Sequence, residues 1–178
     1  MSLANALSLA RLALAIPIVW IGVAVPRADP LYLVALGCFV AGVVTDIADG
    51  MVARRRGVTV IGSALDPLAD AVLILAALFG FAMRVPSLTI AFIVLALRDA
   101  FVFDLRLRLA SRDTALPAVP ASKAKTAFLD VACAALLLAM ATWAYVFLAI
   151  GYAALIVGVF LSLTSALRYF ARARAAHA

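Results

Sequence analysis

The sequence has few charges and few of the residues that build metal-bound or disulfide-bonded soluble domains. Charged residues make up 13% of its 178 residues, about half the usual share in globular domains. Every acid is an aspartate. The single histidine, His177, is the penultimate residue, and we expect it in a frayed tail. The two cysteines, Cys38 and Cys133, both lie in apolar runs, which predicts buried thiols instead of a disulfide framework.

Long apolar runs dominate what is present. Hydrophobic residues make up 68% of the chain and the mean hydropathy is +1.19, which excludes a soluble domain of this size. We therefore expect residues 1–178 to form one polytopic membrane domain. The 15 basic residues outnumber the 9 acids, but they lie in short loops, which favours membrane topology over nucleic-acid binding. The first run continues past Ala15 without a cleavage site, so we interpret it as a retained span.

Six transmembrane helices account for these runs, since a bilayer core needs about 20 apolar residues per helix. No residue from Val131 to Leu167 is charged, a stretch too long for one span, so two helices share it with a turn near Thr142-Trp143. The predicted fold class is all-α, with six helices around a polar cavity that faces the cytoplasm. The expected spans are Leu3 to Val25, Leu31 to Val52, Gly62 to Met83, Leu88 to Leu109, and two within Thr126 to Tyr169.

The basic residues also predict an orientation, because cytoplasmic loops carry an excess of lysine and arginine. Only Arg27 and Arg84 lie in the loops of one side. The other side holds Arg54 to Arg56, the basic residues around the fourth-to-fifth loop, and the C-terminal tail. Both termini should therefore face the cytoplasm, and we expect an integral protein of the bacterial inner membrane.

Four aspartates gather in one block of otherwise membrane-like sequence. Asp46 and Asp49 end the second span and Asp66 and Asp70 begin the third, at spacings that place each pair on one helical face. A short loop joins the two spans, so we expect antiparallel neighbours with all four carboxylates in one cavity. Unpaired charges are costly in a membrane. Hard divalent cations such as Mg²⁺ or Mn²⁺ are the natural partners of carboxylate oxygens.

The block fits the pattern D-x2-D-G-x2-A-R-x7-G-x3-D-x3-D, whose other fixed positions are Gly50, Ala53, Arg54 and Gly62. This pattern resembles the signature of the CDP-alcohol phosphatidyltransferases. Near the N-terminus, the stretch from Ala4 to Arg11 resembles the family's P-N-x-L-T-x-x-R less closely, with Ala for Pro and Ser for Thr. The similarities together cover most of the chain.

The resemblance implies a reaction and roles for these residues. CDP-diacylglycerol binds with its pyrophosphate on two divalent ions, Mg²⁺ or Mn²⁺, an alcohol attacks the lipid-side phosphorus, and CMP leaves. All four aspartates would ligate the metal pair, and Asp70 would also be the general base for the acceptor hydroxyl. Relatives are commonly homodimers, so we expect a homodimer. The residues that would bind the CDP-lipid are Asn5, Ser8, Gly50, Arg54 and Gly62.

Three features resemble relatives with glycerol-type acceptors, the phosphatidylglycerophosphate synthases and eukaryotic-type cardiolipin synthases. They are the stretch from Gly62 to Asp70, the pair Arg98-Asp99, and Ser122-Lys-Ala-Lys-Thr126. We expect glycerol 3-phosphate as the acceptor, with phosphatidylglycerol second; inositol phosphate, inositol and serine remain alternatives.

The basic residues of these stretches have two possible uses. Arg98, Lys123 and Lys125 could bind an acceptor phosphate. A structural ion pair explains Arg98 equally well, and anchoring at the membrane surface explains the lysines. Asp130, inside the fifth span, either pairs with one of these cations or lines the cavity.

Two interpretations of other classes compete with the transferase. A divalent-metal transporter would also place aspartates inside the membrane. However, Gly50 and Arg54 suit a phosphate ligand, and the acids gather at one membrane face instead of continuing across. An inactive homologue is the second alternative, and the intact motif argues against it.

Overall fold

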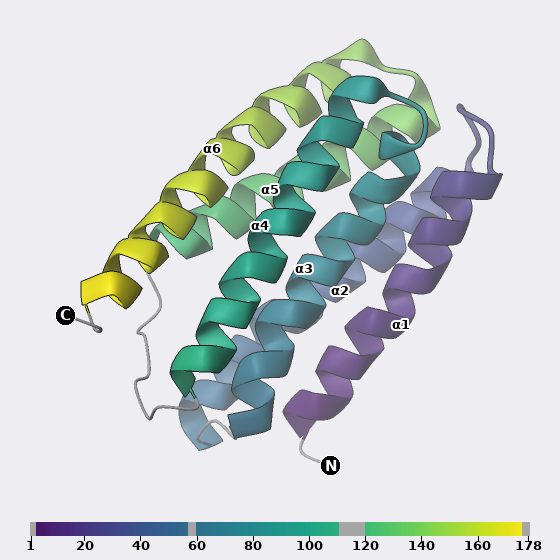
Figure 1. Ribbon diagram of the computed structural model, residues 1–178. Helices are drawn as coiled ribbons and strands as arrows, with labels where there is room; N and C mark the ends of the chain where they lie inside the picture. The colour runs from purple at the N-terminus through teal and green to yellow at the C-terminus, as the bar shows by residue number, and fades with distance from the viewer. Residues whose placement is uncertain (1–2, 57–59, 111–119, 176–178) are drawn as a thin grey trace.

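The chain forms an up-and-down bundle of six α-helices across residues 3–56, 60–110 and 120–175, which the computed structural model describes; side chains are described for residues 6–47, 68–105 and 124–171. Both termini lie at one end of the bundle, and the three turns at residues 25–30, 83–85 and 143–144 lie at the other (Figure 1). The described residues contain no strand. The helices are α1 (Leu3–Ala24), α2 (Leu31–Arg56), α3 (Val60–Ala82), α4 (Pro86–Ala110), α5 (Pro120–Thr142) and α6 (Tyr145–Ala175).

The helix ends lie close to those expected from the sequence. The turn predicted near Thr142-Trp143 is confirmed, because α5 ends at Thr142 and Trp143 adopts a positive φ of 56° before α6 begins. Three helices extend beyond the expected spans. Helix α2 continues past Val52 to Arg56. Helix α5 begins at Pro120 instead of Thr126, and α6 ends at Ala175 instead of Tyr169. Arginine is a good helix former, and positive charge is favourable at a helix C-terminus.

The outer surface of the bundle is strongly apolar. Ile16 on α1, Leu97 on α4 and Ile156 on α6 are each about two thirds or more exposed, at 71%, 68% and 68%. Apolar stretches long enough to cross a bilayer occur at Ala6–Ala24, Ala124–Thr142 and Tyr145–Ala171, and α2 and α3 carry the shorter stretches Leu31–Ile47 and Leu68–Ala82. This arrangement is that of a polytopic membrane protein, as the composition predicts.

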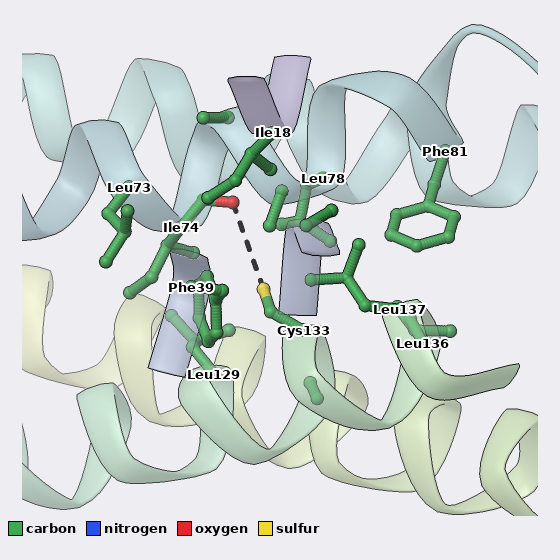
Figure 2. Packing of buried hydrophobic residues seen from close by; sticks show 14 of the residues in the cluster. Ile18, Phe39, Leu73, Ile74, Leu78, Phe81, Leu129, Cys133, Leu136 and Leu137 are labelled. Carbon is green, nitrogen blue, oxygen red and sulfur yellow. Dashed lines mark hydrogen bonds between the residues drawn. The ribbon is translucent and has the colours of Figure 1, made fainter. Parts of the chain in front are cut away.

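Leucine, isoleucine, alanine and phenylalanine side chains fill the interior between the helices (Figure 2). Leu73, Leu78 and Leu129 are almost completely buried. The Cys133 thiol of α5 lies among them and donates a long hydrogen bond to the Ile74 carbonyl oxygen of α3, at 3.8 Å (Figure 2). Both cysteines are free, Cys133 fully buried and Cys38 partly buried. The prediction of a buried thiol is therefore confirmed for Cys133, whereas Cys38 is partly buried and packs against the same core.

The expected pairing of α2 with α3 is present, but it is not the most extensive contact of either helix. The two helices do contact each other, but α3 packs more extensively against α1 and α4, and α2 against α1 and α5. A close approach joins α1 to α3 at Gly22 and Gly80, where a Cβ atom on Gly22 would lie 2.9 Å from the Gly80 Cα. Small residues at such crossings let helix backbones approach closely within membranes.

Candidate active site

A buried ion pair joins α1 to α2 on the side of the aspartate block. The Arg11 Nη1 atom lies 2.5 Å from the Asp46 Oδ1 atom. The Arg11 side chain is completely buried, whereas the Asp46 side chain remains 38% exposed. Ser8, one turn before Arg11, is also buried. The pair fixes one carboxylate oxygen of Asp46 and leaves part of this side chain accessible to a ligand.

Asp70 of α3 lies within the same group of charged residues. It interacts electrostatically with Asp46 of α2, Arg11 of α1, Lys125 of α5 and Asp99 of α4. Five helices therefore bring charged side chains to one region inside the bundle. Asp46 and Asp70 come together although 24 positions separate them in the sequence (70 − 46).

Asp99 connects the cations of α4 and α5. Its Oδ1 atom accepts hydrogen bonds from Arg98 Nη1 at 2.5 Å and from Lys125 Nζ at 3.1 Å. Arg98 also reaches α6, donating from Nε to the Ser162 carbonyl oxygen at 3.0 Å and from Nη2 to the Ser165 hydroxyl. The structural ion pair considered for Arg98 is therefore present, with Asp99 as its partner. The hydrogen bonds of Arg98 to Ser162 and Ser165 join α4 to α6.

A cavity of about 310 Å³ lies between α3, α4 and α5 beside these residues. Its wall includes Asp70, Arg98, Asp99 and Lys125, together with the apolar side chains of all three helices. The volume is within the usual range of small-ligand sites, about 300–1,000 Å³. Two carboxylates and two cationic side chains thus share a pocket large enough for a small polar molecule.

Asp130 of α5 contributes a further carboxylate to this region. It interacts electrostatically with Asp70, Asp46 and Lys125. Its Oδ1 atom is buried and has no hydrogen-bond partner among the described residues. Two roles were considered for Asp130, pairing with a cation or lining the cavity. In the described part of the chain, Asp130 forms no ion pair with Arg98 or Lys125.

Several predicted site residues have side chains outside the described part of the chain. Asp46, Asp70, Ser8, Arg98 and Lys125 are described. Among the described residues alone, no group of three metal-ligating side chains converges. The predicted residues whose side chains lie outside that part are Asn5, Asp49, Gly50, Arg54, Gly62, Asp66 and Lys123.

The described acids fit a hard divalent cation in their chemistry. Asp46 and Asp70 offer carboxylate oxygens, the ligands that Mg²⁺ and Mn²⁺ prefer, and they lie close enough to interact. Asp46 is also partly exposed. A cation between them would offset the repulsion of two carboxylates in a region that is shielded from water.

A protein-family model described as CDP-alcohol phosphatidyltransferase matches residues 1–164. The chain belongs to this family. It is therefore an enzyme, a phosphotransferase that moves a phosphatidyl group from a CDP-alcohol to an alcohol. The family generally depends on divalent metal ions. The match extends from α1 into α6, so the charged interior described above lies entirely within it.

Arg11 is a residue of this site that was not predicted from the sequence. Arg11 is the last position of the N-terminal stretch that resembles the family pattern, and a fully buried arginine in an apolar helix requires a partner. These two signals together could have identified it. The sequence could not show that the partner is Asp46, because the contact joins residues of different helices.

Proposed function

We propose that this enzyme transfers the phosphatidyl group of CDP-diacylglycerol to a glycerol-type alcohol and releases CMP. Glycerol 3-phosphate is the favoured acceptor and phosphatidylglycerol the second. The observation that carries this proposal is the cavity that places Asp70 beside Arg98, Asp99 and Lys125. Both favoured acceptors combine a free hydroxyl with an anionic phosphate group. The cavity wall offers a carboxylate to accept the hydroxyl proton and cations to bind the phosphate group.

Lys125 supports the acceptor assignment most directly. Its ammonium group carries three N–H donors, and the described part of the chain accounts for one of them, in the hydrogen bond to Asp99. The side chain is buried but still contributes to the cavity wall. A buried cation with remaining donors is suited to an anionic ligand. Arg98 contributes charge at the same wall, while its hydrogen bonds hold α6.

Asp70 would act as the general base. In the proposed step the acceptor hydroxyl gives its proton to the Asp70 carboxylate, and the hydroxyl oxygen forms a bond to the lipid-side phosphorus. The bond from that phosphorus to the oxygen of CMP breaks, and CMP leaves with the electron pair. A positioned carboxylate contributes typically about 10²–10⁴-fold to such a proton transfer.

The proposed metal ligands are Asp46, Asp49, Asp66 and Asp70. Divalent ions held there would offset the negative charge of the pyrophosphate and of the departing CMP. Arg11 would position Asp46 through the 2.5 Å ion pair. The nucleotide and its phosphates would contact Asn5, Ser8, Gly50, Arg54 and Gly62.

An apolar groove supports a two-tailed lipid as the donor. It has a volume of about 720 Å³ and lies along α1, α3 and α4, with Ile16, Trp20 and Phe79 in its wall. Val72 and Leu75 line both this groove and the polar cavity. Acyl chains could therefore lie in the groove while the phosphates reach Asp70, so that the lipid need not leave the bilayer.

The remaining features of the proposal concern assembly and orientation. We place the aspartate block and both termini on the cytoplasmic side of a bacterial inner membrane, following the distribution of basic loop residues. We also propose a homodimer. Site-specific labelling of the termini in intact cells would test the orientation, and mass measurement of the purified protein in detergent would test the dimer.

CMP release tests the reaction. Purified protein in lipid, given CDP-diacylglycerol and Mg²⁺ or Mn²⁺, should release CMP with glycerol 3-phosphate and lose this activity when a chelator is added. Parallel reactions contain phosphatidylglycerol, inositol phosphate, inositol or serine. Activity with an acceptor that lacks a phosphate, and none with glycerol 3-phosphate or phosphatidylglycerol, would refute the glycerol-type assignment.

A further inference from the structure

A second cavity lies at the opposite end of the bundle, beside the three short turns. Its volume is about 330 Å³, and its wall is largely apolar, with Phe81, Leu136 and Leu148 among its residues. It shares no lining residue with the polar cavity that holds Asp70. The reaction proposed above therefore makes no use of it.

Two arginines border this apolar cavity. Arg27, in the turn between α1 and α2, is exposed, and Arg84, in the turn between α3 and α4, is partly buried. Neither forms an ion pair with an acid among the described residues. The nearest acid in sequence, Asp29, instead accepts a hydrogen bond from the Leu31 backbone N–H at 2.8 Å.

Among the residues whose side chains are described, the hydrogen-bond partners of Arg84 are neutral groups. Its Nη1 atom donates to the Tyr32 hydroxyl at 2.5 Å, and its Nη2 atom donates to the carbonyl oxygens of Val25 at 2.6 Å and Val23 at 3.1 Å. These bonds satisfy carbonyl groups at the end of α1 and orient the guanidinium group. No carboxylate of the described residues pairs with its positive charge, which favours an anion at the cavity.

Aromatic side chains complete the border of the cavity. Trp143 and Tyr145 lie at the turn between α5 and α6, and the Tyr152 hydroxyl lies 3.2 Å from the Ser87 hydroxyl. Tryptophan and tyrosine are enriched where a membrane meets water. The cavity therefore combines an apolar interior, an interfacial position and two cations.

We propose that this cavity binds one anionic phospholipid from the leaflet at the turn end of the bundle. The phosphate group would lie against the guanidinium groups of Arg27 and Arg84, and an acyl chain would occupy the apolar interior. A zwitterionic lipid offers the same chains but adds a positive group close to the two arginines. The site should therefore select for net negative charge.

Quenching of Trp143 fluorescence tests this site in the full chain. The sequence contains two tryptophans, Trp20 and Trp143, so Trp20→Phe leaves one reporter at the cavity. The protein is reconstituted in phosphatidylcholine vesicles that contain an equal fraction of either brominated phosphatidylglycerol or brominated phosphatidylcholine. No CDP-lipid is added, so no transfer can occur. We expect the anionic lipid to quench Trp143 more strongly than the zwitterionic one.

Variants that remove one positive charge test whether the preference for the anionic lipid arises at this cavity. Arg27→Gln should weaken the preference for the anionic lipid about fivefold, the change that about 1 kcal/mol per basic residue gives. Arg27→Lys keeps the charge and should preserve the preference. Arg168→Gln removes an exposed arginine of α6 at the other end of the bundle and is the matched control. It should leave the preference unchanged.

Three results would overturn the proposal. Equal quenching by both lipids would show that the cavity does not select charge. An equal loss of preference in the Arg27→Gln and Arg168→Gln variants would assign the effect to the overall charge of the protein. Removal of the preference by millimolar inorganic phosphate would identify a free anion as the ligand in place of a lipid.

Discussion

The crossing of α1 and α3 at Gly22 and Gly80 should tolerate no side chain. A Cβ atom on Gly80 would lie 2.8 Å from the carbonyl carbon and 2.9 Å from the carbonyl oxygen of Gly22. These are backbone atoms, so no rotamer change can relieve the contact, and the two helices would have to separate. We therefore expect Gly80→Ala to destabilise the bundle.

The size of the effect follows from two opposing terms. Overpacking costs about 1–3 kcal/mol, and a contact between rigid backbones belongs at the upper end of this range. Replacing glycine by alanine within a helix stabilises the helix by about 1 kcal/mol, because alanine has the higher helix propensity. The net loss is about 2 kcal/mol, which lowers the melting midpoint of a chain of this length by about 4–8 °C.

A matched control exists on α2. A Cβ atom on Gly37 would meet no atom within 4 Å, so Gly37→Ala should keep the gain in helix propensity and raise the midpoint by about 2–4 °C. Unfolding can be followed in detergent with a thiol-reactive dye, because Cys133 is completely buried. The partly exposed Cys38 is replaced by alanine in all samples. Equal midpoints for Gly80→Ala and Gly37→Ala would contradict the reasoning.

Three further predictions concern the charged interior. Arg11→Gln should destabilise the protein by about 3 kcal/mol, the lower end of the range for a broken buried ion pair, because Asp46 is 38% exposed. Thermal midpoints would measure this loss. Adding Asp46→Asn to the Arg11→Gln variant should recover part of it. Asp70→Asn should reduce CMP release at least about 100-fold while CDP-lipid binding, measured by ligand-induced stabilisation, partly survives; full activity would exclude Asp70 as the base. Lys125→Met should raise KM for glycerol 3-phosphate about tenfold or more, because a charged hydrogen bond is lost. The control Asp104→Asn, on α4 outside the cavity wall, should leave KM unchanged. An unchanged KM in Lys125→Met would contradict a role of Lys125 in binding the acceptor phosphate.

Much of the fold could be predicted from the sequence because a membrane restricts the possible structures. Uncharged runs of sufficient length define helices, and the long run from Val131 to Leu167 required a turn, which the structure has at Trp143. The aspartate block could be identified from spacing alone, because neighbours along one helix share a face. Both results depend on residues that are close in the sequence.

Contacts between distant helices could not be predicted in the same way. Helices α2 and α3 contact each other, as the short loop suggested, but the more extensive packing of α1 against α3 at the glycine crossing could not be predicted. The partner of Arg11 and the attachment of Arg98 to Ser162 and Ser165 both depend on how the helices rotate and cross. Periodicity along one helix carries no information about its rotation relative to another.

The buried Arg11–Asp46 pair has a consequence for biogenesis. Helix α1 is made first, and Arg11 lies in the first third of its apolar stretch Ala6–Ala24. An arginine within an isolated transmembrane helix costs up to about 2.5–3.5 kcal/mol during insertion, the value at the helix centre. The carboxylate of Asp46, which forms the ion pair with Arg11, is present only when α2 has also been synthesised. We therefore expect α1 and α2 to enter the bilayer together as a helical hairpin, with α1 alone inserting less completely than its apolar length suggests.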